Sequence, residues 1–142
     1  MPFETQPPME VMTVLIPLPR YYNPDASGAR LAVEDEKLIQ TAEEAAMAFE
    51  AGGELYKYDE NDKRRGVWWN KGMLGWDVLA ALEIDVPDTA DNRAWFEEWA
   101  ADVLLDRFQQ DAIYVKFVGG GATVTPRLIT KKDRKGLAEG PT

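Results

Sequence analysis

Apolar and polar side chains alternate along residues 11–19, with the sequence VMTVLIPLP, and this period of two predicts a β-strand. One face of the strand consists of Met12, Val14, Ile16 and Leu18. The other face is also mostly apolar. Since two apolar faces are typical of a strand in the middle of a sheet that is covered on both sides, we expect residues 11–19 to be a central strand.

Two longer stretches have the helical period of three to four residues. The first helix is expected to start near Val33, with acidic residues in its first turn, and to end at the glycine pair 52–53. The second is expected to start at the sequence PDT, where Asp88 or Thr89 can cap it, and to run to about Gln110. The predicted core stripes are Leu38, Ala42, Ala45 and Phe49 in the first helix and Phe96, Trp99, Val103 and Phe108 in the second.

Further strands are predicted at residues 54–58, 66–70, 78–86 and 112–118. In the third of these, Ala80, Leu82, Ile84 and Val86 are expected to point inward and Glu83 and Asp85 outward. Merging the short middle strands gives the order βαββαβ. This order predicts a ferredoxin-like α+β fold, with an antiparallel sheet, two helices on one face and an extra short hairpin strand.

The chain is expected to form one domain, over residues 11–118. Residues 1–10 are rich in proline and are expected to be loose. Residues 119–142 begin with three glycines and have no clear periodicity. We therefore expect them to form a flexible basic tail, hinged at the glycines.

A ferredoxin-like fold leaves the second face of its sheet open. In this chain Leu15, Leu79 and either Val118 or Phe117 would lie on that open face. An apolar open face needs a cover. We therefore expect a homodimer through the open sheet face, or a tail folded over it.

Net charge narrows the choice of partner. The formal net charge is −9, and residues 119–142 hold five basic and two acidic residues, so that residues 1–118 carry −12. An acidic body repels nucleic acids and membrane surfaces, which argues against either as a partner, unless the basic tail alone binds nucleic acid. No apolar run is long enough to span a bilayer, and MPFETQPPME does not have the pattern of a signal peptide, so we expect a cytoplasmic protein.

The 142-residue sequence contains neither cysteine nor histidine. Disulfides, thiolate nucleophiles, Cys-ligated zinc, iron–sulfur clusters and imidazole-based triads or metal sites are therefore excluded. Any acid–base chemistry would fall to Asp, Glu, Lys or Tyr with a pKa shifted by burial. We expect no cofactor and no metal site, and these absences favour a binding protein over an enzyme.

Three of the five tryptophans lie in the stretch GVWWNKGMLGW, residues 66–76. If residues 66–70 form a strand, Trp68 and Trp69 point to opposite faces, so both cannot fill the same core. All three tryptophans could be packing residues of a twisted hairpin. Alternatively Trp68 or Trp69, with Asn70 and Trp76 nearby, could form an interface or line a pocket.

Other candidate site residues lie outside this stretch. Tyr21 and Tyr22 belong to a polar and aromatic loop, which would form a small pocket if it folded near Trp68 or Trp69. Glu83 and Asp85 could share a site or form a solvated face. Arg107 is expected to suit the C-terminus of its helix by its charge, whereas Gln109 or Gln110 could contact a partner.

Four short stretches together resemble a widespread family of small uncharacterised bacterial proteins. They are LIPLP (residues 15–19), WWNKG (68–72), EIDVPDT (83–89) and RFQQDAIYVKF (107–117). The resemblance implies the same βαββαβ layout and a bacterial origin. It implies no activity and no catalytic residues.

These observations lead to two functional hypotheses. The first is an accessory or interaction protein that acts by binding, through self-association and a protein partner. The second is a cofactor-free small-molecule enzyme or ligand sensor of the dimeric α+β barrel type, in which two such sheets pack around a pocket.

Overall fold

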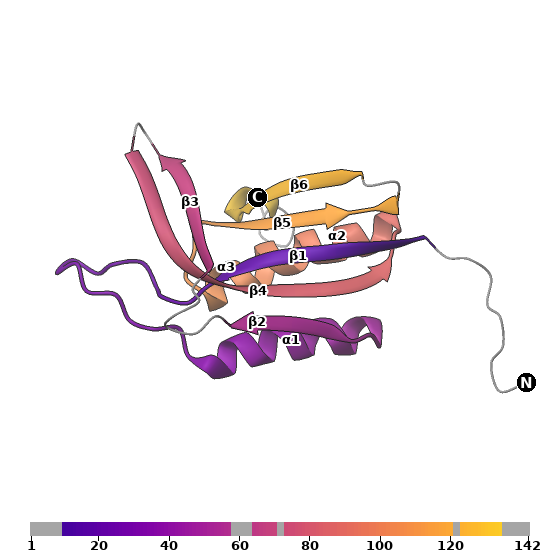
Figure 1. The fold of residues 1–142 in the computed structure, drawn as a ribbon, viewed down its shortest axis with the longest axis horizontal. Helices are drawn as coiled ribbons and strands as arrows, with labels where there is room; N and C mark the ends of the chain where they lie inside the picture. The colour runs from indigo at the N-terminus through magenta and orange to yellow at the C-terminus, as the bar shows by residue number, and fades with distance from the viewer. Residues whose placement is uncertain (1–9, 58–63, 71–72, 121–122, 135–142) are drawn as a thin grey trace, which may run out of the picture.

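The computed structural model describes residues 10–57, 64–70, 73–120 and 123–134, and within these ranges the side chains of residues 56–57, 64–70 and 73–78 are not described. The strands are β1 (Val11–Pro19), β2 (Gly53–Lys57), β3 (Arg64–Asn70), β4 (Met73–Pro87), β5 (Ala112–Val118) and β6 (Val124–Thr130) (Figure 1). The helices are α1 (Asp35–Phe49), α2 (Ala90–Trp99) and α3 (Leu105–Arg107), with a π-helical turn at Ala100–Leu104 and a 3-10 turn at Lys131–Asp133.

The sheet has the order β2-β4-β1-β5-β6, and each neighbouring pair is antiparallel. Strand β3 forms a hairpin with the first half of β4. In Figure 1, α2 runs behind β5 and β1, and α1 lies beside β2. The chain is therefore an α+β protein, consistent with the predicted ferredoxin-like class, and β1 is a central strand as predicted.

The core forms on one face of the sheet, which we call the core face. The predicted inward residues of β1 and β4 are all buried, as are Val115 and Phe117 of β5. Helices α1 and α2 meet in this core, because the ring of Phe49 stacks on Phe96 at 4.9 Å and meets the edge of Trp95 at 4.9 Å. Aromatic contacts between the two helices thus stabilise their packing.

Several predicted boundaries differ from the structure. Helix α1 begins at Asp35, and the left-handed residue that ends it is Glu50, with φ 49°, in place of the predicted glycine pair. Thr89 caps α2 as predicted, by accepting a hydrogen bond from the backbone of Asn92. The second helix does not continue unbroken to Gln110, because a π-helical turn interrupts it.

The prediction of a flexible tail after residue 118 is wrong for residues 124–134. Residues Val124–Thr130 form strand β6, paired with β5 along its full length, and Ile129 is fully buried. The side chain of Arg134 then donates to the carbonyl of Ala101 at 2.7 Å and to the carboxylate of Asp106 at 2.6 Å. The segment is ordered because it completes the sheet and is attached to the second helical region.

The alternate strand positions form the other face of the sheet, which we call the open face. Leu15 lies in the middle of one row of cross-strand neighbours on this face. The row runs from β2 to β6 through Glu54, Glu83, Leu15, Lys116 and Pro126. Val118 belongs to the open face, whereas Phe117, which was offered as an alternative, is buried on the core face.

Candidate functional site

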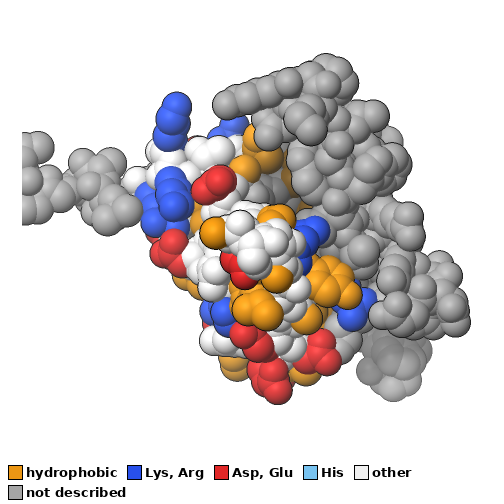
Figure 2. Space-filling view, turned by 90° about the vertical axis from the view of Figure 1, so that its left-hand side faces the viewer, with side chains coloured by type: hydrophobic (Ala, Val, Ile, Leu, Met, Phe, Trp, Pro, Cys, Tyr) orange, Lys and Arg blue, Asp and Glu red, His pale blue; other side chains and the backbone are white. Residues whose placement is uncertain are grey.

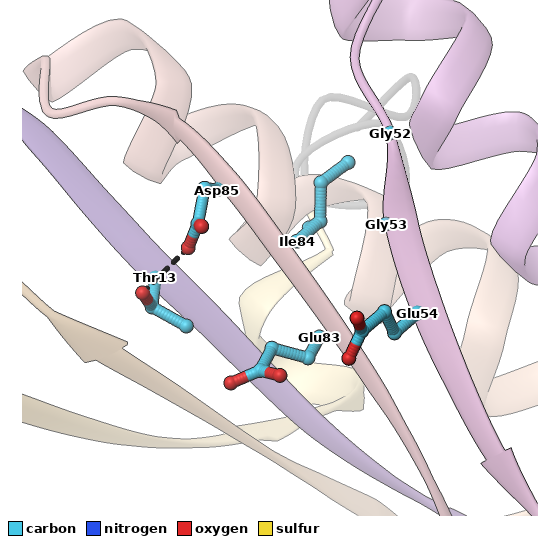
Figure 3. A pocket seen from close by; sticks show the side chains of 7 residues that line it. All are labelled: Thr13, Gly52, Gly53, Glu54, Glu83, Ile84 and Asp85. Atoms are coloured by element: carbon cyan, nitrogen blue, oxygen red, sulfur yellow. Dashed lines mark hydrogen bonds between the residues drawn. The ribbon is translucent and has the colours of Figure 1, made fainter.

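An open depression of about 310 Å³ lies on the sheet where β1, β2 and β4 adjoin. Figure 3 shows its acidic side chains on one side of the strands: Glu54 from β2, and Glu83 and Asp85 from β4. The hydroxyl of Thr13 in β1 donates a hydrogen bond to Asp85 at 2.6 Å. Gly52, Gly53 and the backbone region of Ile84 complete the lining.

The strand register explains why these carboxylates gather. Glu54 and Glu83 are cross-strand partners, and Asp85 lies two residues further along the same face of β4. Adjacent carboxylates create a negative potential that attracts cationic groups. Within the described ranges, no group of three or more acidic side chains is arranged to hold a metal ion. The acidic lining of the depression is suited to a cationic group.

The β5–β6 half of the open face is apolar. Tyr114 pairs with Leu128, and Val118 pairs with Val124. Three of these side chains are exposed, Tyr114 by 39%, Val124 by 51% and Leu128 by 63%. The open face thus changes from acidic at β2 and β4 to apolar at β5 and β6. The sequence prediction missed this half because it treated residues 124–130 as a tail.

Lys116 is the basic residue within this apolar half. Its side chain is half-buried, and it has no ion pair or side-chain hydrogen bond with any residue the structure describes. Leu15 separates it from Glu83 in the row across the sheet. On its other side, in β6, its cross-strand neighbour is Pro126.

Tyr22 takes part in a polar network away from the open face. It is 8% exposed, and its hydroxyl donates to Glu34 at 2.5 Å and accepts from Lys37 at 2.6 Å. Lys37 also donates to the carbonyl of Arg107 at 3.1 Å. Burial and the bond to Glu34 raise the pKa of Tyr22, so its hydroxyl stays protonated and is a poor general base. This network fastens the loop after β1 to α1 and α3.

A second buried cluster continues from this network. The Arg107 guanidinium donates to Glu44 at 2.5 Å and to the hydroxyl of Thr41 at 3.0 Å, and the indole of Trp99 donates to Glu44 at 3.0 Å. Burial alone would raise the pKa of Glu44, but the bonds from Arg107 and Trp99 hold it below its usual value. Arg107 therefore pairs α3 with α1, a role that its predicted place at a helix C-terminus did not reveal.

The loop residues that were candidates for a pocket make local contacts. The guanidinium of Arg30 lies 5.9 Å from the centre of the Tyr21 ring. Gln109 is exposed, has φ 52°, and accepts a long hydrogen bond from Asn23 at 3.5 Å through its carbonyl. At this end of the molecule hydrophobic, acidic and basic side chains are interspersed (Figure 2). The structure thus brings Asn23 to Gln109.

The tryptophan-rich stretch can be placed only by its backbone. Residues Trp68, Trp69 and Asn70 belong to β3 and pair with Gly75, Leu74 and Met73 of β4, while Trp76 pairs with Val67. The side chains of Trp68, Trp69, Asn70 and Trp76 lie outside the described part of the structure. Their predicted contribution to an interface or a pocket stays a prediction.

Within the described residues, no helix is long and apolar enough to cross a membrane.

No protein-family model and no curated protein matches the sequence. The fold is similar to that of a phage SAM lyase in its apo state, with 11% identity, a TM-score of 0.50, and coverage of 86% of this chain and 89% of that one. A phage SAM lyase in complex with S-methyl-5'-thioadenosine aligns with 13% identity, a TM-score of 0.47, and coverage of 92% and 95%. At this level of identity the likeness to the apo structure describes the fold alone.

Proposed function

We propose that this protein acts by binding, and that the open face of its sheet associates with a second copy of the chain. The observation that carries the proposal is the distribution of exposed hydrophobic side chains. Of the seven large ones among the described residues, four lie on the open face: Val11, Tyr114, Val124 and Leu128. Such a concentration on one face is typical of an interaction surface.

The proposal includes the complete ferredoxin-like arrangement, in which α1 and α2 both lie on the core face. Their contacts through Phe49 and Phe96 support this arrangement, as does the burial of Phe96 next to Phe117 of β5. The open face then has no helix over it. A second sheet packing against it at about 10 Å would bury its apolar half.

The test compares two identical substitutions at exposed leucines. Leu128 on the open face is 63% exposed, and Leu31 in the loop after β1 is 72% exposed. We expect Leu128→Asp to convert a dimer into a monomer, because the interface would have to bury a new charge, and Leu31→Asp to leave the dimer intact. Sedimentation equilibrium measures both, and a wild-type protein that is monomeric at every concentration overturns the proposal.

The acidic depression supports a second candidate, the cofactor-free enzyme or ligand sensor. Its carboxylates would bind a small organic cation, and SAM, the substrate named for the fold neighbour, is a cation suitable as a probe. Isothermal titration of SAM into wild type and into Glu54→Gln distinguishes the candidates. Binding that Glu54→Gln weakens favours the ligand-binding candidate, whereas the absence of any heat of binding to either protein counts against it.

A further inference from the structure

We infer that the two copies pack face to face about a two-fold axis parallel to β1, which places Leu15 on its counterpart and Glu83 of each copy against Lys116 of the other. This inference deepens the self-association proposed above and rests on it. It assigns which residues meet and in which direction the strands of the two sheets run.

The argument starts from one row of cross-strand neighbours. Glu83 is the partner of Leu15 in β4, and Lys116 is its partner in β5. Neighbouring strands are about 4.8 Å apart, so the acid and the base lie at equal distances on opposite sides of Leu15. A rotation about an axis parallel to β1 that passes above Leu15 exchanges the two sides. It therefore brings each Glu83 over a Lys116 of the other copy.

The charges select this axis over the perpendicular one. A two-fold axis across the strands, above the same Leu15, leaves each residue on its own side of β1. Glu83 of one copy would then face Glu83 of the other, and Lys116 would face Lys116. Like charges facing each other at an interface are strongly unfavourable, whereas opposite charges fix the register of association. The parallel axis is the one that avoids both repulsions.

The neighbouring residues also fit this packing. Two residues away from Lys116 along β5, Tyr114 is 39% exposed, and two residues away from Glu83 along β4, Ala81 is 6% exposed. The same rotation places the ring of Tyr114 over the small Ala81 of the other copy. A large side chain against a small one is the pairing that lets two sheets approach closely. Each ion pair would have this contact on one side, and on its other side the same rotation places Val118 of one copy over Asp85 of the other.

The half-buried Lys116 gives the inference its strongest support. Nothing in the described part of the chain pairs with its ammonium group. In Figure 3, Glu83 extends along the sheet surface, with its carboxylate on the open side of the strands. Glu83 already takes part in an interaction within its own chain. In the dimer its carboxylate would in addition reach the ammonium group of the other copy, so two equivalent ion pairs would form.

The experiment uses two charge reversals, Glu83→Lys and Lys116→Glu, each alone and then mixed. Alone, each variant would place two like-charged pairs in its homodimer, and we expect dimerisation to weaken about tenfold or more. Mixed in equal amounts, the two variants restore both attractive pairs in a heterodimer. Sedimentation equilibrium measures the dissociation constant of the dimer in each sample. Thermal unfolding confirms that each variant folds.

The outcomes separate this inference from the proposed function. Weak homodimers with a strong mixed dimer support the inference, because only contacts between copies can produce that rescue. A wild-type dimer that neither reversal weakens, or one that is weakened without rescue on mixing, overturns the inference and leaves self-association standing. A wild-type protein that is monomeric throughout overturns both.

Discussion

The two faces of the sheet differ in how completely their side chains find partners within the chain. On the core face, Phe117 and Ile129 are fully buried and pack in the same core as both helices. On the open face, Tyr114 and Leu128 are exposed, and Lys116 has no side-chain partner among the described residues. The core face therefore contributes its buried side chains to the stability of the monomer, whereas the β5–β6 half of the open face leaves large apolar side chains exposed to solvent. Substitutions on the core face should therefore lower the free energy of unfolding, whereas substitutions on the open face should change it little.

The largest effect on folding is expected from Phe96→Ala. Phe96 is fully buried, stacks on Phe49 and contacts the ring of Trp99. Replacing it with alanine removes these contacts and leaves a cavity, so we expect the free energy of unfolding to fall by about 4 kcal/mol. Urea unfolding of the variant and the wild type at one protein concentration measures the change. A loss below about 1 kcal/mol would show that the helices do not depend on this core.

A smaller effect, which depends on pH, is expected from Arg107→Met. At neutral pH the variant removes the ion pair of Glu44 and leaves its hydrogen bonds with Trp99 and Gln40. We expect a loss of about 2 kcal/mol, since Glu44 is partly exposed. The folded pKa of Glu44 lies below its unfolded value. Its ionised form therefore stabilises the fold above the unfolded pKa, and this contribution disappears as pH falls through the folded pKa.

The pH dependence provides the control for that prediction. Below the folded pKa of Glu44 the wild type no longer has the ion pair, so the difference between the two proteins should shrink. Urea unfolding of both proteins at neutral pH and at about pH 3 measures this difference. A difference that stays constant over this range would mean that Arg107 acts through packing and not through its charge.

The smallest effect is expected on the open face. Thr13→Val keeps the shape of the side chain and removes its hydrogen bond to the exposed Asp85. Water can replace that bond, so the free energy of unfolding should change by less than about 0.5 kcal/mol. Thermal unfolding at a fixed protein concentration tests this. A loss of unfolding free energy as large as that of Arg107→Met would contradict the expectation that the open face contributes little to the stability of the monomer.

Much of the fold could be predicted because it depends on local alternation. Met12, Val14, Ile16 and Leu18 of β1 and Ala80, Leu82, Ile84 and Val86 of β4 are buried, as the period of two in the sequence predicts. Thr89 was also predictable as a cap, since its side chain acts on the backbone three residues away. The residue that ends α1 could not be predicted, because Glu50 adopts the left-handed conformation that is usual for glycine.

The parts that could not be predicted depend on contacts that are distant in the sequence. The partner of Arg107 is Glu44, 63 residues earlier, and nothing in either local sequence indicates the pair. Strand β6 was missed because it follows three glycines and contains Pro126, although its alternation of Val124, Pro126 and Leu128 with polar residues was visible. Glu83 and Asp85 were predicted to point outward, but the cross-strand neighbours of Glu83 were assigned only by the strand register, which places Glu83 and Lys116 on either side of Leu15.

The proline in β6 has a consequence for how assemblies of this protein can grow. β6 lies at the end of the sheet order, and Pro126 sits in the middle of that strand. Proline has no backbone N–H and is tolerated in an edge strand where its nitrogen faces outward. A strand from another molecule added at this edge would lack a hydrogen bond at its centre. The edge thus resists the strand-by-strand polymerisation that leads to fibres.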